Sequence, residues 1–274
     1  MRRFLTAALL AATPAAFADD IETLDFSYAL PNGEEATSVV FFPEEAEGEE
    51  VPVIFVIPEW WGLNDYAKMR AEDLAHEGYV AIALDMYGGD RVTEEPGQAG
   101  QWAGAAQQVG LGVLAGAGID AAEAALDELA IEPDGMGAIG FCFGGSTVVA
   151  LAQSDWADRL DGVVSFHGGL SKDSAPQGDY AGPPMLILHG GADPLVPPDA
   201  FGGFVQQAVT AGVPLSIVNF PDAVHAFTNP GADAKAEEYP QLAGAIAFDE
   251  EASEVSFEVM FEFFEITIGE PDDD

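Results

Sequence analysis

One short segment of the chain has the residues that nucleophilic chemistry requires. The only cysteine, Cys142, lies between Gly140 and Gly144 in the sequence Gly-Phe-Cys-Phe-Gly-Gly. An apolar run, 136–140, precedes this cysteine, and a helix-like run, 146–153, follows it. A strand, a sharp turn and a helix in that order are typical of a nucleophile elbow, here with sulfur as the nucleophile. A buried structural cysteine is the alternative, because free cysteine behaves as a small hydrophobe.

The glycines around Cys142 favour the catalytic interpretation of this turn. Glycines two residues before and two residues after a nucleophile let the backbone turn sharply without Cβ clashes. The first amides of the following helix then point at the thiol and can stabilise an oxyanion.

A nucleophilic thiol requires a base and a group that orients the base, and two later segments supply both. Asp193 follows the apolar strand predicted at 184–189, and His225 follows the strand predicted at 214–220. Nucleophile, acid and histidine occur in this order on α/β-hydrolase sheets, at the carboxyl ends of parallel strands, where ligands bind. Taken singly, an Asp-Pro pair is an ordinary turn, and a loop histidine is usually structural or solvated.

These motifs resemble those of the dienelactone hydrolase family, a branch of the α/β-hydrolases that uses a Cys-His-Asp triad. The resemblance covers residues 26–268 and rests on the segments 140–145, 189–197 and 225–227. It implies an α/β-hydrolase fold, with a mostly parallel central sheet and helices on both faces. It also implies a carboxylic ester or lactone hydrolase that works through a thioester acyl-enzyme and needs no cofactor.

A fourth motif, Pro-Glu-Trp-Trp-Gly-Leu-Asn at 58–64, extends the resemblance. By resemblance, Glu59 is the partner of the thiol, and the backbone N–H groups of Trp60 and Phe143 form the oxyanion hole. A first-turn acid before the predicted helix 64–76, favoured by the helix dipole, is the alternative for Glu59. We favour the functional interpretation, because a carboxylate directly after a buried strand is costly unless it is paired.

Two departures from the family pattern concern the substrate. The resemblance leads us to expect two arginines that bind a substrate carboxylate, but Gly89 and Asn229 stand at those positions. The nearby Arg91 could substitute for the first arginine. The fold and triad therefore carry over, whereas a dienelactone substrate does not follow. We expect the substrate pocket to include Arg91 and Asn229, together with aromatic side chains that are candidates for an apolar acyl pocket or for the core: Trp61, Tyr87, Phe141 and Phe227.

The charge of the chain excludes some partners and indicates an unusual environment. The 274 residues include 48 acidic and 8 basic side chains, for a net charge of −40. Such a charge excludes nucleic-acid binding, and it destabilises a compact chain in dilute buffer through self-repulsion. Glu254, Glu258 and Glu262 repeat at i,i+4 without a lysine to pair with, and molar salt would screen that repulsion. We therefore predict a halophilic protein whose partner is a small ester or lactone.

The amino terminus has the pattern of a secretory signal peptide. A basic start at 1–3, an apolar stretch at 4–12 and an Ala-Phe-Ala cleavage site at 16–18 lie in the expected order. We predict removal of 1–18, export to the periplasm or the exterior, and one α/β-hydrolase domain over 19–274. No apolar run is long enough to span a membrane, and no group of residues has the spacing of a metal site.

The remaining elements follow from apolar periodicity. His167 and His189 end apolar strands near the predicted site. We expect supporting hydrogen bonds from both, with contact to the substrate as the alternative for either. A catalytically silent hydrolase fold that binds a small apolar ligand in the periplasm remains the alternative function, and the oligomeric state, monomer or dimer, stays open. We predict strands at 26–30, 37–43, 51–57, 79–87, 136–140, 160–167, 184–189 and 214–220, helices at 64–76, 120–130, 146–153, 198–212 and 253–268, and a loose helix or loop at 99–118.

Overall fold

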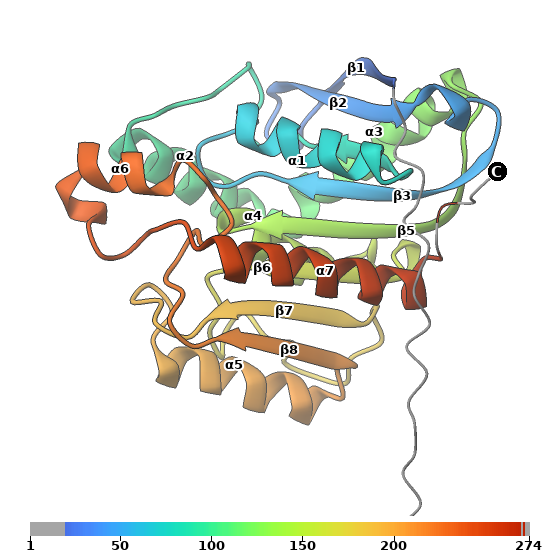
Figure 1. The fold of residues 1–274 in the computed structure, drawn as a ribbon. Coiled ribbons are helices and arrows are strands. Elements are labelled where there is room, and N and C mark those ends of the chain that lie inside the picture. The colour runs from blue at the N-terminus through green and yellow to red at the C-terminus, as the bar shows by residue number, and fades with distance from the viewer. Residues whose placement is uncertain (1–19, 270, 272–274) are drawn as a thin grey trace, which may run out of the picture.

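The chain forms a central sheet flanked by helices, as the computed structural model in Figure 1 shows for residues 20–269 and 271. The predicted signal peptide, 1–18, and the acidic residues 272–274 lie outside the described residues.

The sheet has eight strands in the order β1-β2-β4-β3-β5-β6-β7-β8. The pairs β1–β2 and β2–β4 are antiparallel, and all later pairs are parallel. This arrangement confirms the predicted α/β class and the opening antiparallel pair. The strands are β1 Ile21–Ala29, β2 Glu35–Pro43, β3 Glu50–Ile57, β4 Val80–Ala83, β5 Glu132–Phe141, β6 Gly162–Phe166, β7 Met185–Gly190 and β8 Leu215–Phe220.

Helices cover both faces of the sheet, and each face has its own apolar cluster. Helices α1 and α7 lie on the face toward the viewer in Figure 1, and α3, α4 and α5 pack on the other face. The side chain of Asn64 caps α1 by accepting from Ala67 N at 3.2 Å. The helices are α1 Asp65–His76, α2 Pro96–Val109, α3 Leu111–Glu128, α4 Phe143–Leu151, α5 Pro198–Ala211, α6 Ala232–Glu238 and α7 Glu250–Thr267, with 3₁₀ turns η1 Glu44–Ala46, η2 Ala157–Arg159 and η3 Pro240–Leu242.

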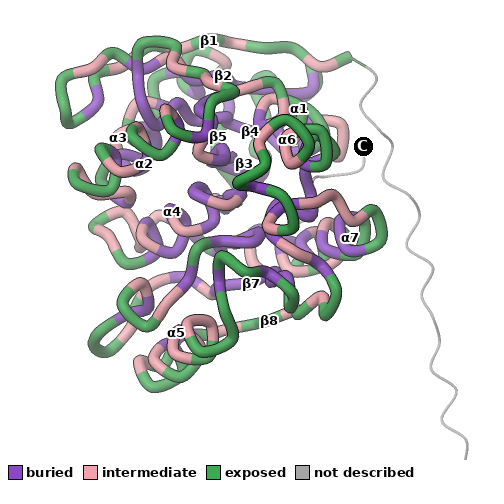
Figure 2. The backbone as a smooth tube through the Cα atoms, turned by 90° about the vertical axis from the view of Figure 1, so that its left-hand side faces the viewer, coloured by how far each residue is buried: buried purple, intermediate pink, exposed green. Residues whose placement is uncertain are grey.

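The carboxyl ends of the parallel strands meet at one edge of the sheet. In Figure 1 the arrowheads of β3, β5, β7 and β8 point to the left, and Figure 2 looks onto that side. The segments after β3, β5, β7 and β8 carry Glu59, Cys142, Asp193 and His225. The topology therefore places all four candidate residues on the same side of the molecule.

The segment predicted as a loose helix or loop, 99–118, lies within two well-formed helices. They are α2 and α3, which meet at Gly110 with a positive φ of 113°. The glycines that lower helix propensity serve packing instead, because a Cβ at Gly116 would lie 2.2 Å from the Trp156 ring. Tertiary contact thus overrides local propensity here. No single helix among residues 20–269 is long and apolar enough to cross a membrane, and α2 with α3 passes that test only as a pair bent by 83°.

The strand predicted at 79–87 ends earlier, at Ala83, because Asp85 turns the chain. Its Oδ1 accepts from Tyr87 N at 2.9 Å and from Gly88 N at 3.0 Å. An aspartate that bonds backbone amides two and three residues ahead forms a local turn that competes with strand pairing.

We predict opposite effects of alanine at two glycines of the α2–α3 pair. Gly116→Ala would force the added methyl group into the Trp156 ring and lower the free energy of unfolding by about 1–3 kcal/mol. Gly104→Ala, with nothing within 4 Å of its Cβ, would raise that free energy by up to about 1 kcal/mol. Urea unfolding of both variants checks this, and equal effects would contradict the packing role of Gly116.

Candidate active site

Cys142 occupies a strained turn between β5 and α4. Its backbone has φ 54° and ψ −109°, a region that residues with a Cβ rarely adopt. The turn requires glycine on both sides: a Cβ at Gly140 would lie 2.1 Å from the Gly144 carbonyl oxygen, and one at Gly144 would lie 2.1 Å from the Ile57 carbonyl oxygen. Strain of this kind is concentrated at functional sites.

Two contacts hold the backbone amide of Cys142. Its N–H donates to Phe166 O at 3.0 Å and to His167 Nδ1 at 3.1 Å. Phe166 is the last residue of β6, the neighbouring parallel strand, and His167 comes directly after it. The sheet itself therefore fixes the position of the turn.

The candidate oxyanion donors lie beside the thiol. Helix α4 begins at Phe143, so the N–H of this residue has no acceptor within the helix. Trp60 follows Glu59 in the loop after β3, and its carbonyl oxygen accepts from the Tyr87 hydroxyl at 3.0 Å. Among residues 20–269 no hydrogen bond uses the N–H of Trp60 or Phe143. Both groups are therefore available to a ligand oxygen.

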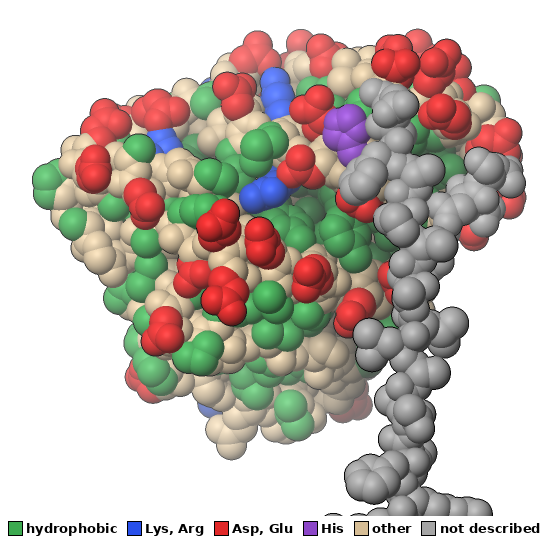
Figure 3. Space-filling model, viewed as in Figure 1, with side chains coloured by type: hydrophobic (Ala, Val, Ile, Leu, Met, Phe, Trp, Pro, Cys, Tyr) green, Lys and Arg blue, Asp and Glu red, His purple; other side chains and the backbone are tan. Residues whose placement is uncertain are grey.

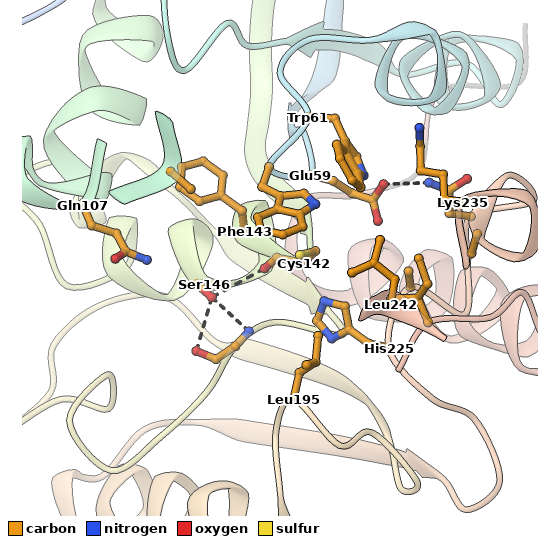
Figure 4. A pocket seen from close by; sticks show the side chains of 17 residues that line it. Glu59, Trp61, Gln107, Cys142, Phe143, Ser146, Leu195, His225, Lys235 and Leu242 are labelled. Atoms are coloured by element: carbon orange, nitrogen blue, oxygen red, sulfur yellow. Dashed lines mark hydrogen bonds between the residues drawn. The ribbon is translucent and has the colours of Figure 1, made fainter. Parts of the chain in front are cut away.

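Asp193 and His225 form a buried hydrogen bond. His225 Nδ1 donates to Asp193 Oδ2 at 2.7 Å, and Asp193 Oδ1 accepts from Leu195 N at 2.7 Å. The backbone amide of Leu195 thus fixes the carboxylate, and the carboxylate fixes the imidazole tautomer. The other ring nitrogen, Nε2, is buried without a hydrogen-bond partner among the described atoms, and the ring lies next to Cys142 in Figure 4.

The charge on His225 depends on its two acidic neighbours. Burial opposes the charged form, but a thiolate on Cys142 and the carboxylate of Asp193 raise the pKa of His225 well above its usual 6.5. His225 therefore holds its second proton more readily than a free imidazole does.

Glu59 is buried, with 3% of its surface exposed, and its partner is Asn229. Asn229 Nδ2 donates to Glu59 Oε2 at 2.6 Å, while Asn229 Oδ1 accepts from Gly231 N at 2.8 Å and so fixes the amide orientation. Burial raises the pKa of Glu59, although Asn229 and the positive charges around it act in the opposite direction. Glu59 therefore takes up a proton more readily than an exposed glutamate.

A network behind the catalytic candidates was not foreseen from the sequence. Since His167 Nδ1 accepts from Cys142 N, its Nε2 carries the proton and donates to Thr228 Oγ1 at 2.8 Å. Thr228 Oγ1 also pairs with the Tyr66 hydroxyl at 2.8 Å, and the Thr228 carbonyl accepts from Arg70 Nη2 at 2.8 Å. Burial lowers the pKa of His167 well below its usual value, so this histidine stays neutral.

The network ties three parts of the fold together. Tyr66 and Arg70 belong to α1, His167 follows β6, and Thr228 lies three residues after His225. Of the two histidines expected to support the site, His167 does so through hydrogen bonds, whereas His189 stacks on Phe201 with ring centroids 3.8 Å apart.

The candidate residues surround a cavity of about 360 Å³ (Figure 4). Glu59, Cys142 and His225 line it together. Most of the remaining lining is apolar: Trp60, Trp61, Ala103, Phe143, Leu195, Ala226, Ala232, Leu242 and Ile246.

The other predicted pocket residues divide into two groups. Trp61 and Asn229 line the cavity, whereas Phe141 and Phe227 are fully buried in the core and Tyr87 packs behind Phe143. Arg91 does not line the cavity; its guanidinium binds Glu34 Oε1 and the Tyr87 carbonyl oxygen, each at 2.8 Å. Arg91 therefore does not stand in for a carboxylate-binding arginine in this structure.

No cluster within residues 20–269 has the ligands for a metal ion.

Comparison with known proteins gives one consistent result. The family model described as "Dienelactone hydrolase family" matches residues 37–268. A protein of Escherichia coli K12 named "Putative carboxymethylenebutenolidase" is 26% identical over 233 residues, which cover 80% of this chain and 82% of that protein. A solved dienelactone hydrolase-like promiscuous phosphotriesterase from metagenomic libraries is 28% identical, with a TM-score of 0.77 over 91% of this chain and 99% of that one. Brefeldin A esterase, 17% identical with a TM-score of 0.56 over 92% of this chain and 81% of its own, shares the fold.

We predict that the pKa of His225 lies above the usual 6.5 and that the pKa of His167 lies below it. With four histidines in the chain, a ¹H–¹⁵N spectrum of histidine-labelled protein resolves them. His225 should keep its second proton above pH 6.5, and His167 should remain neutral below it. Cys142→Ala should move the His225 midpoint down, because it removes the thiolate charge. An unchanged midpoint in that variant would contradict the proposed ion pair.

Proposed function

The chain belongs to the dienelactone hydrolase family of ester and lactone hydrolases, and we propose that it hydrolyses a small ester or lactone through a Cys142–His225–Asp193 triad. The observation that carries this proposal is the buried Asp193–His225 hydrogen bond of 2.7 Å beside a thiol held at a strained turn. The bond leaves His225 Nε2 for the thiol, which is the arrangement that activates a nucleophile.

In the first step the Cys142 thiolate attacks the carbonyl carbon of the substrate. The carbonyl oxygen becomes an oxyanion that the N–H groups of Trp60 and Phe143 stabilise. When the tetrahedral intermediate collapses, the C–O bond to the alcohol breaks and a thioester forms on Cys142. The departing alkoxide takes the proton from the His225 imidazolium.

In the second step water releases the acyl group. Acylation removes the thiolate charge that favours the imidazolium, so His225 is neutral and can accept a proton from water. The resulting hydroxide attacks the thioester, the C–S bond breaks, and the thiolate–imidazolium pair is restored. Thiolates are good leaving groups, which favours activated esters and lactones over amides.

We assign Glu59 as the acidic partner of the thiol. It lines the same cavity as Cys142 and His225, and its burial raises its pKa. Buried carboxylates with raised pKa values are typical of groups that exchange protons in catalysis.

We further propose that the protein is exported and works in high salt. The pattern at 1–18 supports export, and the acidic surface supports the salt environment. Figure 3 shows acidic side chains spread across the viewed face with few Lys or Arg among them. Removal of 1–18 takes away Arg2 and Arg3 and no acidic residue, which would change the net charge from −40 to −42.

One histidine variant and one cysteine variant test the triad. His225→Gln and Cys142→Ala should each lower kcat/KM for p-nitrophenyl acetate by about 10³-fold or more, because each removes a member of one unit. His189→Gln is the matched control, since His189 lies in a neighbouring strand, stacks on Phe201 and does not line the cavity. It should retain activity within about threefold. Loss of activity in all three, or in none, would contradict the assignment, with circular dichroism used to show that each variant is folded.

Salt dependence tests the proposed environment. Raising NaCl from about 50 mM to about 2 M should raise Tm, because the Debye length falls to a few ångströms. Glu254, Glu258 and Glu262 are exposed on one face of α7. Changing all three to Gln should raise the free energy of unfolding by about 0.5–1 kcal/mol in low salt. The gain should vanish in high salt. A Tm that stays flat or falls with salt would be evidence against a halophilic protein.

A further inference from the structure

Besides His225, one basic side chain lines the cavity within the described residues, and an acidic partner already pairs with it. Lys235, from α6, forms an ion pair with Glu94 Oε2. Its Nζ lies 4.6 Å from the centroid of the Trp61 ring, close enough for a cation–π contact. The Lys235 side chain is 13% exposed and that of Glu94 is 71% exposed. Glu94 therefore covers the ammonium group from the solvent side.

The position of Lys235 limits what it can offer a substrate. In Figure 4 its side chain lies beyond Glu59, and the ammonium end points away from Cys142 and His225. The positive charge of Lys235 also acts on Glu59, where it opposes the increase in pKa that burial causes. The cation thus pairs with Glu94 and lies against the Trp61 ring, and mainly its aliphatic stem is left for the cavity.

Three contributions to the free energy of binding would oppose an anionic substrate in this cavity. The substrate would have to displace Glu94 from Lys235, approach the buried Glu59, and lose its hydration against Trp61, Leu242 and Ile246. A buried charge is costly unless a partner replaces its water. None of these contributions opposes an uncharged acyl group, which gains from the apolar wall.

We infer that this cavity selects uncharged, apolar acyl groups and rejects carboxylate-bearing ones, and that Glu94 sets this preference by neutralising Lys235. The inference rests on the proposed ester hydrolysis. It assigns Glu94 and Lys235 as specificity-determining residues, although neither takes part in acyl transfer.

The test compares substrates of equal acyl length that differ in charge. They are p-nitrophenyl hexanoate, the mono-p-nitrophenyl ester of adipic acid, and methyl p-nitrophenyl adipate as an uncharged polar control. Assays in about 2 M NaCl screen the general negative field of the protein and leave the local contacts. The variants are Glu94→Gln, Glu94→Gln with Lys235→Met, and Glu238→Gln. The last removes one negative charge from exposed Glu238 on the same helix as Lys235, without freeing the lysine.

The wild-type protein should favour the hexanoate over the adipate monoanion by about tenfold or more in kcat/KM. The methyl adipate should behave like the hexanoate. Glu94→Gln should narrow the hexanoate-to-adipate ratio by about three- to tenfold through a lower KM for the anion, because it frees Lys235. The double variant should lose that gain, and Glu238→Gln should leave the ratio as in the wild type.

Three outcomes would overturn the inference. The wild type could cleave the adipate monoanion as well as the hexanoate, Glu94→Gln could change the ratio no more than Glu238→Gln does, or the double variant could keep the gain. Each of these would leave Cys142-dependent ester cleavage in place. Absence of cleavage of all three esters by a folded wild type would instead contradict the proposed function and the inference with it.

Discussion

The backbone conformation of Cys142 is the constraint on which the site depends. Cys142 has a positive φ at the turn between β5 and α4. Glycine is required on both sides of it, since Cβ atoms at Gly140 and Gly144 would overlap backbone carbonyls. Such a conformation persists only when the surroundings over-determine it. The two acceptors of the Cys142 amide, Phe166 O and His167 Nδ1, provide that constraint from the adjacent strand. The same turn leaves the Phe143 N–H without an acceptor beside the sulfur.

The histidine that positions Cys142 also helps to position His225. His167 accepts from Cys142 and donates to Thr228, whose backbone belongs to the loop that carries His225. Arg70 and Tyr66 hold the same threonine from α1. His167 must stay neutral to accept and donate at once, and its complete burial keeps it so. A single uncharged imidazole thereby couples the elbow, the histidine loop and the helix after Glu59.

The sequence was sufficient to propose the candidate residues whose positions depend on chain order. Cys142, Asp193 and His225 could be proposed because each follows a strand whose apolar run is visible, and parallel strands bring their carboxyl ends to one edge. The Glu59–Asn229 bond could not be foreseen, because its partners lie 170 residues apart and neither neighbourhood indicates the other.

Predictions from the sequence failed where side-chain packing determines the structure. Over 99–118, glycines that make room for Trp156 and Ala150 lowered the local helix propensity, so the pattern predicted only a loose helix or loop, whereas the second half of α3 was predicted as a helix. Arg91 was expected in the pocket from its position in the chain, but its guanidinium is held by Glu34. Lys235 was overlooked because α6 is short and its apolar pattern is weak, whereas the fold brings it against Trp61.

The most direct test of the central claim is to trap the acyl-enzyme. The protein is mixed with p-nitrophenyl hexanoate, quenched in acid within the first turnovers, and analysed by intact mass and peptide mapping, where the single cysteine makes the assignment unambiguous. We expect a hexanoyl adduct on the peptide with Cys142 that is absent in Cys142→Ala. The adduct should be more abundant in His225→Gln, because that variant lacks the base for deacylation. Turnover of the ester by Cys142→Ala at the wild-type rate, or a hexanoyl adduct on another residue, would contradict the central claim.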